Sequence, residues 1–250
     1  MSLPTLADPA RFALFCDFDG TLVDIAATPD QVRLSGSTRR AIALLFHALG
    51  GALAIISGRD IATIDRLLEP LRLPAAGTHG LVRRDAAGTV HGSTRPHAGL
   101  ERVAARLEAF AAGRPGLLVE HKSGAVTLHF RVAPHLEAAC VGAARSAIAD
   151  TPTLAIRRGK MNVEVAPHGA DKGAAIAAFM AEPPFGGRLP VFAGDDTTDE
   201  DGFAAVNRMG GISIKIGSEP SSASHRAGGT PEFLDWFTHT ARRLARSASA

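Results

Sequence analysis

The first 80 residues alternate between short apolar runs and segments with the spacing of amphipathic helices. Residues 12–16, 51–57 and 73–80 are mostly apolar and end at polar residues or glycines, which is typical of short buried strands. Residues 37–49 and 58–71 lie between them and repeat apolar side chains at helical intervals. Because strands and helices alternate, this part of the chain predicts a parallel sheet with helices on its faces.

The middle of the chain has a different pattern. It predicts a hairpin, a helix, two alternating strands, a second helix and two more strands, over residues 81–92, 97–112, 116–131, 134–150 and 154–167. Consecutive strands joined by short turns form antiparallel sheets, so this stretch predicts an α+β module unlike the parts on either side of it.

The parallel pattern resumes with a helix that starts at Lys172. A strand at 188–194, a helix from Thr198, a strand at 211–217 and a final helix at 231–246 follow. The sequence therefore predicts an α/β fold with a Rossmann-like parallel-sheet core, residues 1–84 and 166–250, interrupted by an inserted α+β domain, residues 85–165. Ligands of such cores bind beyond the carboxyl ends of the strands, so functional residues are expected there.

Composition argues against several classes of function. The 250 residues are 46% hydrophobic, which supports a sizeable core, and 27 basic against 25 acidic residues leave a net charge of +2. This balance does not favour a nucleic-acid or membrane partner, and no apolar run reaches the ~20 residues of a membrane span. The N-terminus lacks the pattern of a secretory signal, and Cys16 and Cys140 form no disulfide framework. We therefore expect a cytoplasmic protein with neither a nucleic-acid nor a membrane partner. The composition does not define the oligomeric state, for which a monomer is favoured, and a small-molecule substrate is expected from the residues below.

Four polar signals fall where predicted strands end or helices begin. Asp17 and Asp19 follow the first strand, and Ser57 closes the second. Lys172 opens a helix, and an acidic run directly after residues 188–194 contains Asp195, Asp196, Asp199, Glu200 and Asp201. Two carboxylates two residues apart at the end of a buried strand either lie in solvent or share a cation, because like charges repel and their burial is costly.

These residue types together suit the transfer of a phosphoryl group. Carboxylates from two strand ends make a hard-oxygen site for Mg²⁺, and a hydroxyl, a lysine and backbone N–H groups suit a phosphate. One carboxylate can attack phosphorus to give an aspartyl-phosphate, while a second acid protonates the leaving oxygen and then activates water. Each pair of like unit charges at ~4 Å costs ~4 kcal/mol at an effective dielectric of about 20, so Mg²⁺ is needed as well as the lysine.

Each signal also has a simpler explanation. An isolated pair of aspartates is common on surfaces, Ser57 is a usual helix start, Lys172 alone would be a solvated residue, and acids favour helix N-termini in general. A calcium loop of the EF-hand type is excluded, because Leu22 stands where its glycine belongs and Thr28 where its glutamate belongs. The order and placement of all four signals favour one catalytic site.

At these residues the chain resembles the haloacid dehalogenase superfamily of phosphotransferases. The stretches "DFDGTL" (17–22), "ISGR" (56–59), "DKG" (171–173) and "GDDTTDED" (194–201) are similar to its four motifs, in order. The resemblance implies that Asp17 is the nucleophile and Asp19 the general acid and base. It implies that Ser57 and Lys172 hold the phosphoryl oxygens.

The resemblance also implies a Mg²⁺ ion held by Asp17, the backbone carbonyl of Asp19, and Asp195. Asp196 and Asp199 would support this ion or its waters. Three residues within the first two motifs are expected to contact the substrate: Gly20, Thr21 and Gly58.

The likeness extends to the trehalose-6-phosphate phosphatases. "GTHG" (77–80), "VEHKSGAVTLHFR" (119–131), "GKMNVEVAPHGADKG" (159–173) and the fourth motif followed by "GF" are similar to stretches of that family. In that family the insert is a cap that closes on the core and recognises the disaccharide. The resemblance therefore implies that residues 85–165 form a cap in which Glu120, Lys122 and Glu164 bind sugar hydroxyls. Further candidates for substrate contacts are Arg59, His129, Arg131 and Lys160.

The cap residues have an alternative explanation, and two positions differ from the family pattern. Glu120 and Lys122 are two apart on a predicted strand, so they face the same way, but a solvated ion pair would give the same pattern. The family often has Tyr where Phe18 stands, in a chain with no tyrosine, and Arg is common where Ala166 stands. The loss of that Arg removes a candidate contact to phosphate or cap.

The function implied is Mg²⁺-dependent hydrolysis of trehalose 6-phosphate to trehalose and phosphate through phosphorylated Asp17. A related phosphatase for another sugar phosphate, such as sucrose or glucosylglycerol phosphate, has the same core chemistry. Nucleic-acid binding through the basic cluster of Arg157, Arg158 and Lys160 is disfavoured, because the cluster is short and has no stacking aromatic residues nearby.

Overall fold

The computed structural model describes residues 3–26, 28, 31–92, 99–122, 124–168 and 171–248. The chain divides into two compact units. Unit 1 comprises Met1–His91 and Asp171–Ala250, and unit 2 comprises Gly92–Ala170. From the sequence we predicted these boundaries at 84/85 and at 165/166. The first falls inside the predicted hairpin at 81–92. The second falls inside a strand of unit 2, Asn162–Pro167.

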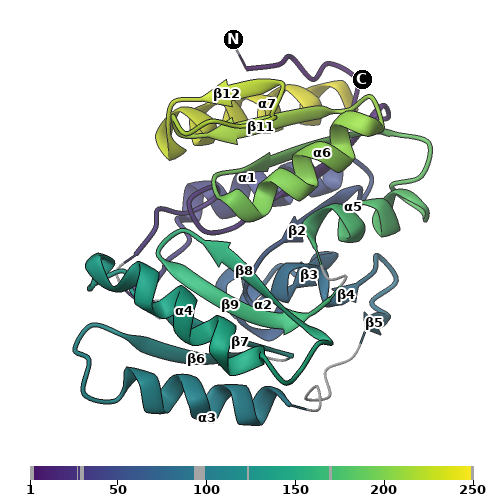
Figure 1. Cartoon of the computed structure of the whole chain (residues 1–250). Coiled ribbons are helices and arrows are strands. Elements are labelled where there is room, and N and C mark those ends of the chain that lie inside the picture. The colour runs from purple at the N-terminus through teal and green to yellow at the C-terminus, as the bar shows by residue number, and fades with distance from the viewer. Residues whose placement is uncertain are drawn as a thin grey trace. The chain divides into compact units, whose positions relative to one another are not determined.

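Among the described residues, unit 1 contains an eight-stranded sheet with the order β12-β11-β10-β1-β2-β3-β4-β5 (Figure 1). The strands are β1 (Phe12–Cys16), β2 (Leu53–Ile56), β3 (Ala75–Gly77), β4 (Val82–Arg84), β5 (Val90–Gly92), β10 (Leu189–Gly194), β11 (Ile212–Ile216) and β12 (His225–Ala227). Pairing is parallel from β12 to β3, and β4 is antiparallel to β3. The predicted hairpin at 81–92 thus extends the sheet of unit 1 and is not part of the insert.

β1 lies at the point where the strand order reverses. It pairs with β2 on one side and with β10 on the other, with Cys16 opposite Ala193. The chain moves outward to β2 and β3 in one direction and from β10 to β11 and β12 in the other. Such a switch point opens a crevice at the carboxyl ends of the two central strands, where ligands of open α/β sheets bind.

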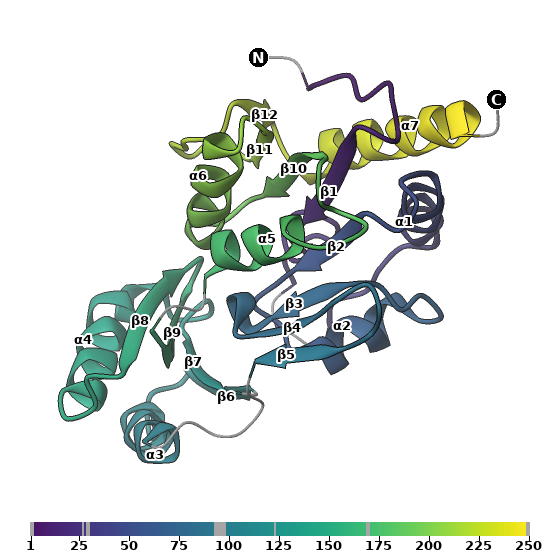
Figure 2. The same ribbon diagram turned by 90° about the vertical axis from the view of Figure 1, so that its right-hand side faces the viewer.

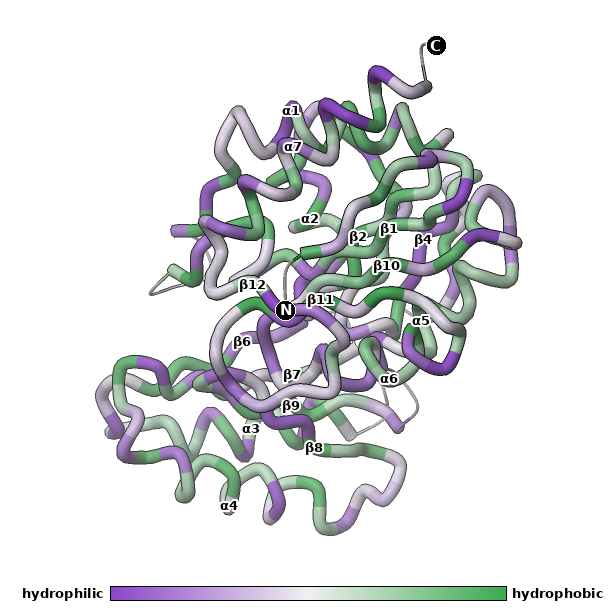
Figure 3. Tube along the Cα trace, turned by 90° about the horizontal axis from the view of Figure 1, so that it is seen from above, coloured by the Kyte–Doolittle hydropathy of each residue, from purple (hydrophilic) through white to green (hydrophobic). Residues whose placement is uncertain are grey.

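Helices cover both faces of this sheet (Figure 2). One face carries α1 (Gly36–Ala48), α2 (Ile61–Leu68) and α7 (Thr230–Ala248), and the other carries α5 (Lys172–Met180) and α6 (Glu200–Arg208). The central strands are hydrophobic along their length, as the green tube of β1, β2 and β10 in Figure 3 shows, because both of their faces are covered.

An aromatic cluster anchors one helix layer to β1. The ring of Phe15 lies 5.4 Å from that of Phe185 and 5.9 Å from that of Phe179, and all three side chains are fully buried. Each such side chain stabilises the fold by roughly 1.5–3 kcal/mol through apolar burial alone. This packing fixes α5 against β1, and so fixes the position of Lys172, the first residue of α5.

Unit 2 is an antiparallel sheet with helices on one face. The strands β6 (Leu118–Lys122), β7 (Ala125–His129), β8 (Leu154–Gly159) and β9 (Asn162–Pro167) have the order β6-β7-β9-β8. Helices α3 (Leu100–Ala111) and α4 (Glu137–Ile148) pack on the face that carries the core residues Leu128 and Val163. Since side chains alternate along a strand, Glu120, Lys122 and Glu164 lie on the opposite face. The predicted fold class, a parallel-sheet α/β core with an inserted α+β domain, is confirmed.

Among the helices in the described ranges, none has both the length and the apolarity required to cross a membrane.

In unit 2, an ion pair joins α3 to Asp150, the second residue after the end of α4. The guanidinium of Arg106 donates from Nη1 to Asp150 Oδ1 at 2.8 Å and from Nη2 to Oδ2 at 2.9 Å. These hydrogen bonds, together with the charge of Arg106, lower the pKa of Asp150 to about 2.

We expect Arg106→Gln to return the pKa of Asp150 from about 2 toward the ordinary value of about 3.9. Because the folded-state pKa is the lower one, the pair stabilises the protein above about pH 4, and this stabilisation is lost as pH falls toward about 2. The energetic effect will be small, since both side chains are about half exposed. Carbon-13 NMR titration of the Asp150 carboxyl in both proteins measures the shift, and equal pKa values would contradict the assignment.

Candidate active site

Three buried carboxylates meet at the β1/β10 switch point. Asp17 follows β1, and its N–H donates to the Ala193 carbonyl at 2.9 Å, which extends the pairing of the two strands. Asp195 follows β10, and Asp199 lies in the short 3₁₀ turn after it. One carboxylate oxygen from each of Asp17, Asp195 and Asp199 lies within 4.8 Å of the other two. Their exposed fractions are 5%, 6% and 0%, so water screens their repulsion poorly.

Lys172 offsets part of this negative charge. Asp171 caps the N-terminus of α5 by accepting a hydrogen bond from Ala174 N, and Lys172 is the first residue of the helix. Its Nζ lies 2.7 Å from Asp17 Oδ1 and 2.7 Å from Asp199 Oδ1. Burial alone would lower the pKa of Lys172, but the two carboxylates outweigh it and raise that pKa well above its usual range.

Asp17 retains an unfavourable environment for its charge. Burial raises the pKa of Asp17 well above its usual range, and the nearby Asp199 and Asp195 raise it further, against the lowering effect of Lys172. Three carboxylates and one ammonium group leave two net negative charges in the cluster. One divalent cation with oxygen ligands balances that charge, so the donor set fits Mg²⁺.

Two glycines create the space for the acids. Gly20 has φ +81°, and a Cβ atom there would lie 2.2 Å from Asp195 Oδ2. A Cβ at Gly194 would lie 2.2 Å from Asp199 Cγ. Neither position accepts a side chain without moving a carboxylate of the cluster, which explains why glycine stands at both.

Asp196 and Asp199 have separate roles in the turn. The N–H of Asp196 donates to Asp199 Oδ2 at 2.8 Å, while Asp196 Oδ1 accepts from Thr197 N at 2.6 Å. Asp199 therefore braces the turn with one oxygen and holds Lys172 with the other. Asp196 caps the turn, and its carboxylate is not part of the three-acid cluster.

Asp19 is held by Arg59. The guanidinium donates from Nε to Asp19 Oδ2 and from Nη2 to Oδ1, each at 2.7 Å. This bidentate pair fixes the orientation of the Asp19 carboxylate. From the sequence we predicted that Arg59 contacts the substrate. In this structure it instead binds Asp19, the predicted general acid and base.

Ser57 lies in a constrained turn at the end of β2. Its hydroxyl is buried and accepts from Arg59 N at 3.1 Å. Thr78 and His79, with φ values of 49° and 55°, occupy the left-handed region and donate from their N–H groups to the carbonyls of Arg59 and Ser57. A Cβ at Gly58 would lie 2.6 Å from His79 Nε2, so a side chain there would require the His79 ring to move. Backbone strain held by such contacts is typical of functional sites.

Two contacts at the site had not been predicted. The ammonium of Lys215 on β11 donates to the Asp195 carbonyl, and Thr230 Oγ1 at the start of α7 donates to the Gly20 carbonyl at 2.9 Å. A lysine inside the apolar run "ISIKI" was a signal for the first contact. Thr21, predicted to contact substrate, is fully buried, and its hydroxyl has no hydrogen-bond partner among the described residues.

The predicted cap residues form a polar network on one face of unit 2. Lys122 Nζ lies 2.9 Å from Glu164 Oε2, which also accepts from Thr127 Oγ1 at 3.1 Å. Glu120 Oε2 lies 2.8 Å from His129 Nε2 and 4.0 Å from Lys122 Nζ. The remaining candidates lie off the strands, Arg131 after β7 and Lys160 in the turn between β8 and β9.

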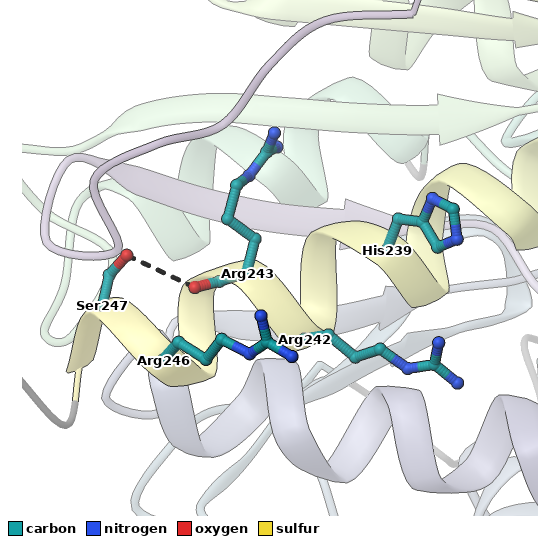
Figure 4. A pocket seen from close by; sticks show the side chains of 5 residues that line it. All are labelled: His239, Arg242, Arg243, Arg246 and Ser247. Atoms are coloured by element: carbon teal, nitrogen blue, oxygen red, sulfur yellow. Dashed lines mark hydrogen bonds between the residues drawn. The ribbon is translucent and has the colours of Figure 1, made fainter.

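A basic hollow beside α7 contains none of the predicted site residues. Its lining consists of His239, Arg242, Arg243, Arg246 and Ser247, all exposed (Figure 4). The Ser247 hydroxyl donates to the Arg243 carbonyl at 3.3 Å within the helix. Basic side chains near a helix C-terminus are favoured by the helix dipole, which accounts for this cluster without a ligand.

The sheet order, the three acids at its switch point and the lysine that two of them contact define the class that the motifs predicted, the haloacid dehalogenase superfamily. Within it, the chain belongs to the trehalose-phosphatase family, whose model matches residues 15–231.

Relatives agree with this assignment. The chain is 45% identical over 228 residues to trehalose-6-phosphate phosphatase of Escherichia coli K12, covering 91% of this chain and 86% of that protein. It is 44% identical over 225 residues to a probable trehalose-phosphate phosphatase of Sinorhizobium fredii, covering 90% and 84%. The C-terminal domain of the Candida albicans trehalose-6-phosphate phosphatase shares the fold, with a TM-score of 0.84 at 22% identity and 93% of each chain covered.

We expect the three-acid cluster to bind a divalent cation and Gly20→Ala to abolish that binding, because the new methyl group would displace the Asp195 carboxylate. Gly187→Ala is the matched control, since Gly187 has φ +78° and a Cβ atom there would have no neighbour within 4 Å. Both variants should lose ~1–2 kcal/mol of stability to left-handed strain. Calorimetric titration with Mg²⁺ should detect binding to the control but not to Gly20→Ala, and equal binding would contradict this account of the glycine.

Proposed function

We propose that the protein is a Mg²⁺-dependent phosphatase that hydrolyses trehalose 6-phosphate to trehalose and phosphate. The observation that carries the proposal is the buried set of Asp17, Asp195 and Asp199 around Lys172 at the switch point. Membership of the trehalose-phosphatase family and the names of its relatives support the substrate.

The carboxylates of Asp17 and Asp195, with the backbone carbonyl of Asp19, would hold the Mg²⁺ ion. Asp199 would contribute its charge and fix the turn. When bound, Mg²⁺ supplies positive charge that reduces repulsion between the phosphate ester and the carboxylates.

In the first step, a carboxylate oxygen of Asp17 attacks phosphorus and the bond from phosphorus to the sugar oxygen breaks. Asp19 enters this step as the carboxylic acid, with its protonated oxygen released from Arg59, and gives that proton to the leaving oxygen, so trehalose departs as the neutral alcohol and the phosphoryl group remains on Asp17. Lys172 and Ser57 hold the phosphoryl oxygens during the transfer. Arg59 orients the protonated Asp19 through one hydrogen bond, and the bidentate pair of this structure forms once Asp19 is a carboxylate.

In the second step, water replaces the sugar oxygen. Asp19, now a carboxylate, accepts a proton from the water as its oxygen attacks phosphorus. The bond between phosphorus and Asp17 breaks, which releases inorganic phosphate and restores the carboxylate of Asp17.

Unit 2 would recognise the sugar. Glu120, Lys122 and Glu164 combine charged acceptors with a charged donor on one sheet face, a set that forms strong hydrogen bonds with hydroxyl groups. Glu164 is only 1% exposed, so its orientation is fixed before any ligand binds.

Phosphate release from a panel of sugar phosphates tests the proposal. We expect the highest kcat/KM for trehalose 6-phosphate among that ester, sucrose phosphate, glucosylglycerol phosphate and glucose 6-phosphate.

Excess chelator should reduce turnover by at least about 100-fold, and Asp17→Asn by more than about 10⁴-fold. Circular dichroism should show Asp17→Asn folded, because it removes a buried like-charge repulsion. A preferred monosaccharide phosphate, or undiminished activity in chelator, would reject the proposal.

We expect Glu120→Gln to lower kcat/KM for trehalose 6-phosphate by about 10-fold, since a hydrogen bond to a charged group contributes roughly 1.5–3 kcal/mol. Hydrolysis of p-nitrophenyl phosphate, which has no sugar, should change by less than about twofold. The matched control is Glu108→Gln, because Glu108 forms the same 2.8 Å pair with a histidine, His121, from a side chain on α3. Equal losses on both substrates, or in both variants, would exclude sugar recognition by Glu120.

A further inference from the structure

Lys215 is a buried charged residue to which the proposed reaction assigns no role. It lies on β11, whose other residues are Ile212, Ser213, Ile214 and Ile216, and its exposed fraction is 3%. Burial of an ammonium group is costly unless nearby groups compensate it. Its Nζ donates to the backbone carbonyl of Asp195, and the carboxylate of Glu219 lies 3.9 Å away at a largely exposed position.

The sheet register directs Lys215 to that carbonyl. Lys215 pairs with Gly194, the last residue of β10, and the side chain reaches one residue further to Asp195. The Asp195 peptide is thus fixed by Lys215, while its carboxylate lies against the Cα of Gly20. The two contacts restrain the backbone and side chain of Asp195 independently.

Lys215 also changes the charge of the buried set. Asp17, Asp195 and Asp199 contribute three negative charges, and Lys172 and Lys215 contribute two positive ones. Counted with Lys215, the buried set has one net negative charge in place of two, and a bound divalent cation would make it one net positive charge. The Glu219 carboxylate is largely exposed and is not counted in the buried set. A positive site is what a phosphate ester requires.

We propose that Lys215 is a positioning residue that holds Asp195 in the geometry for binding the divalent cation. This inference rests on the proposed Mg²⁺ site. Lys215 binds the main-chain carbonyl of Asp195 and so fixes the backbone from which the Asp195 side chain extends. Loss of this contact lets the backbone shift, and the carboxylate then moves away from Asp17 and Asp199. Removal of a positive charge by itself would instead tighten cation binding, so the direction of the change distinguishes positioning from a purely electrostatic role.

The test is the dissociation constant of Mg²⁺, measured by calorimetry on the folded full-length protein without substrate. Lys215→Met keeps the length of the side chain but removes its donor and charge. Arg243→Met is the matched control, because it removes an exposed positive charge from α7. Circular dichroism and thermal melts in chelator report the fold separately from cation binding. If Lys215→Met does not fold, Lys215→Gln is measured by the same criteria.

We expect Lys215→Met to raise the dissociation constant about tenfold or more, the effect typical of losing a residue that orients a metal ligand. Arg243→Met should match the wild type. A folded Lys215 variant whose dissociation constant lies within about twofold of wild type, or is lower, would overturn the inference and leave the Mg²⁺ site intact. Absence of Mg²⁺ binding by the wild-type protein would overturn the proposed function and this inference together.

Discussion

The interaction on which the rest of the site depends is the contact of one buried ammonium with two buried carboxylates. Lys172 lies 2.7 Å from both Asp17 and Asp199, in surroundings where an unpaired carboxylate would take up a proton. Asp17 must remain a carboxylate if it is to act as a nucleophile. The lysine therefore has to reach it from α5, which the whole of unit 2 separates from β1 along the chain.

Sheet topology satisfies this requirement. The carboxyl ends of β1, β2 and β10 meet at one edge, so residues just past each strand converge although they are distant in sequence. Because the acids converge, they must pack closely against the backbone. Gly20 leaves room for the Asp195 carboxylate and Gly194 for that of Asp199, each 2.2 Å from where a Cβ atom would be. The charge of Lys172, the register of the central strands and the absence of side chains at Gly20 and Gly194 are therefore coupled, because a change in any of them displaces the acids.

Features with a local signal could be predicted from the sequence. Apolar runs that end in acids or in Ser57 marked the strand ends, and the motif order marked the superfamily. Features that depend on tertiary register could not. β12 has three residues and one buried apolar side chain, β4 and β5 join the sheet of unit 1, and Asp19 meets Arg59 only because β1 and β2 are neighbours. The separate roles of Asp196 and Asp199 depend on the hydrogen bonds of a three-residue turn.

The two units present different electrostatic environments, and the proposed reaction needs both. A phosphate ester requires fixed charge, which unit 1 concentrates in buried acids and lysines that the proposed divalent cation would make net positive. A disaccharide is uncharged and requires donors and acceptors in similar number. Unit 2 offers these as Glu120 and Glu164 alternating with Lys122 and Arg157, so opposite charges on this face compensate each other and a sugar bound there as proposed would meet no strong net field. If the protein acts as proposed, discrimination between sugar phosphates depends on the placement of unit 2 hydrogen-bonding groups, because the phosphoryl chemistry of unit 1 is the same for each of them.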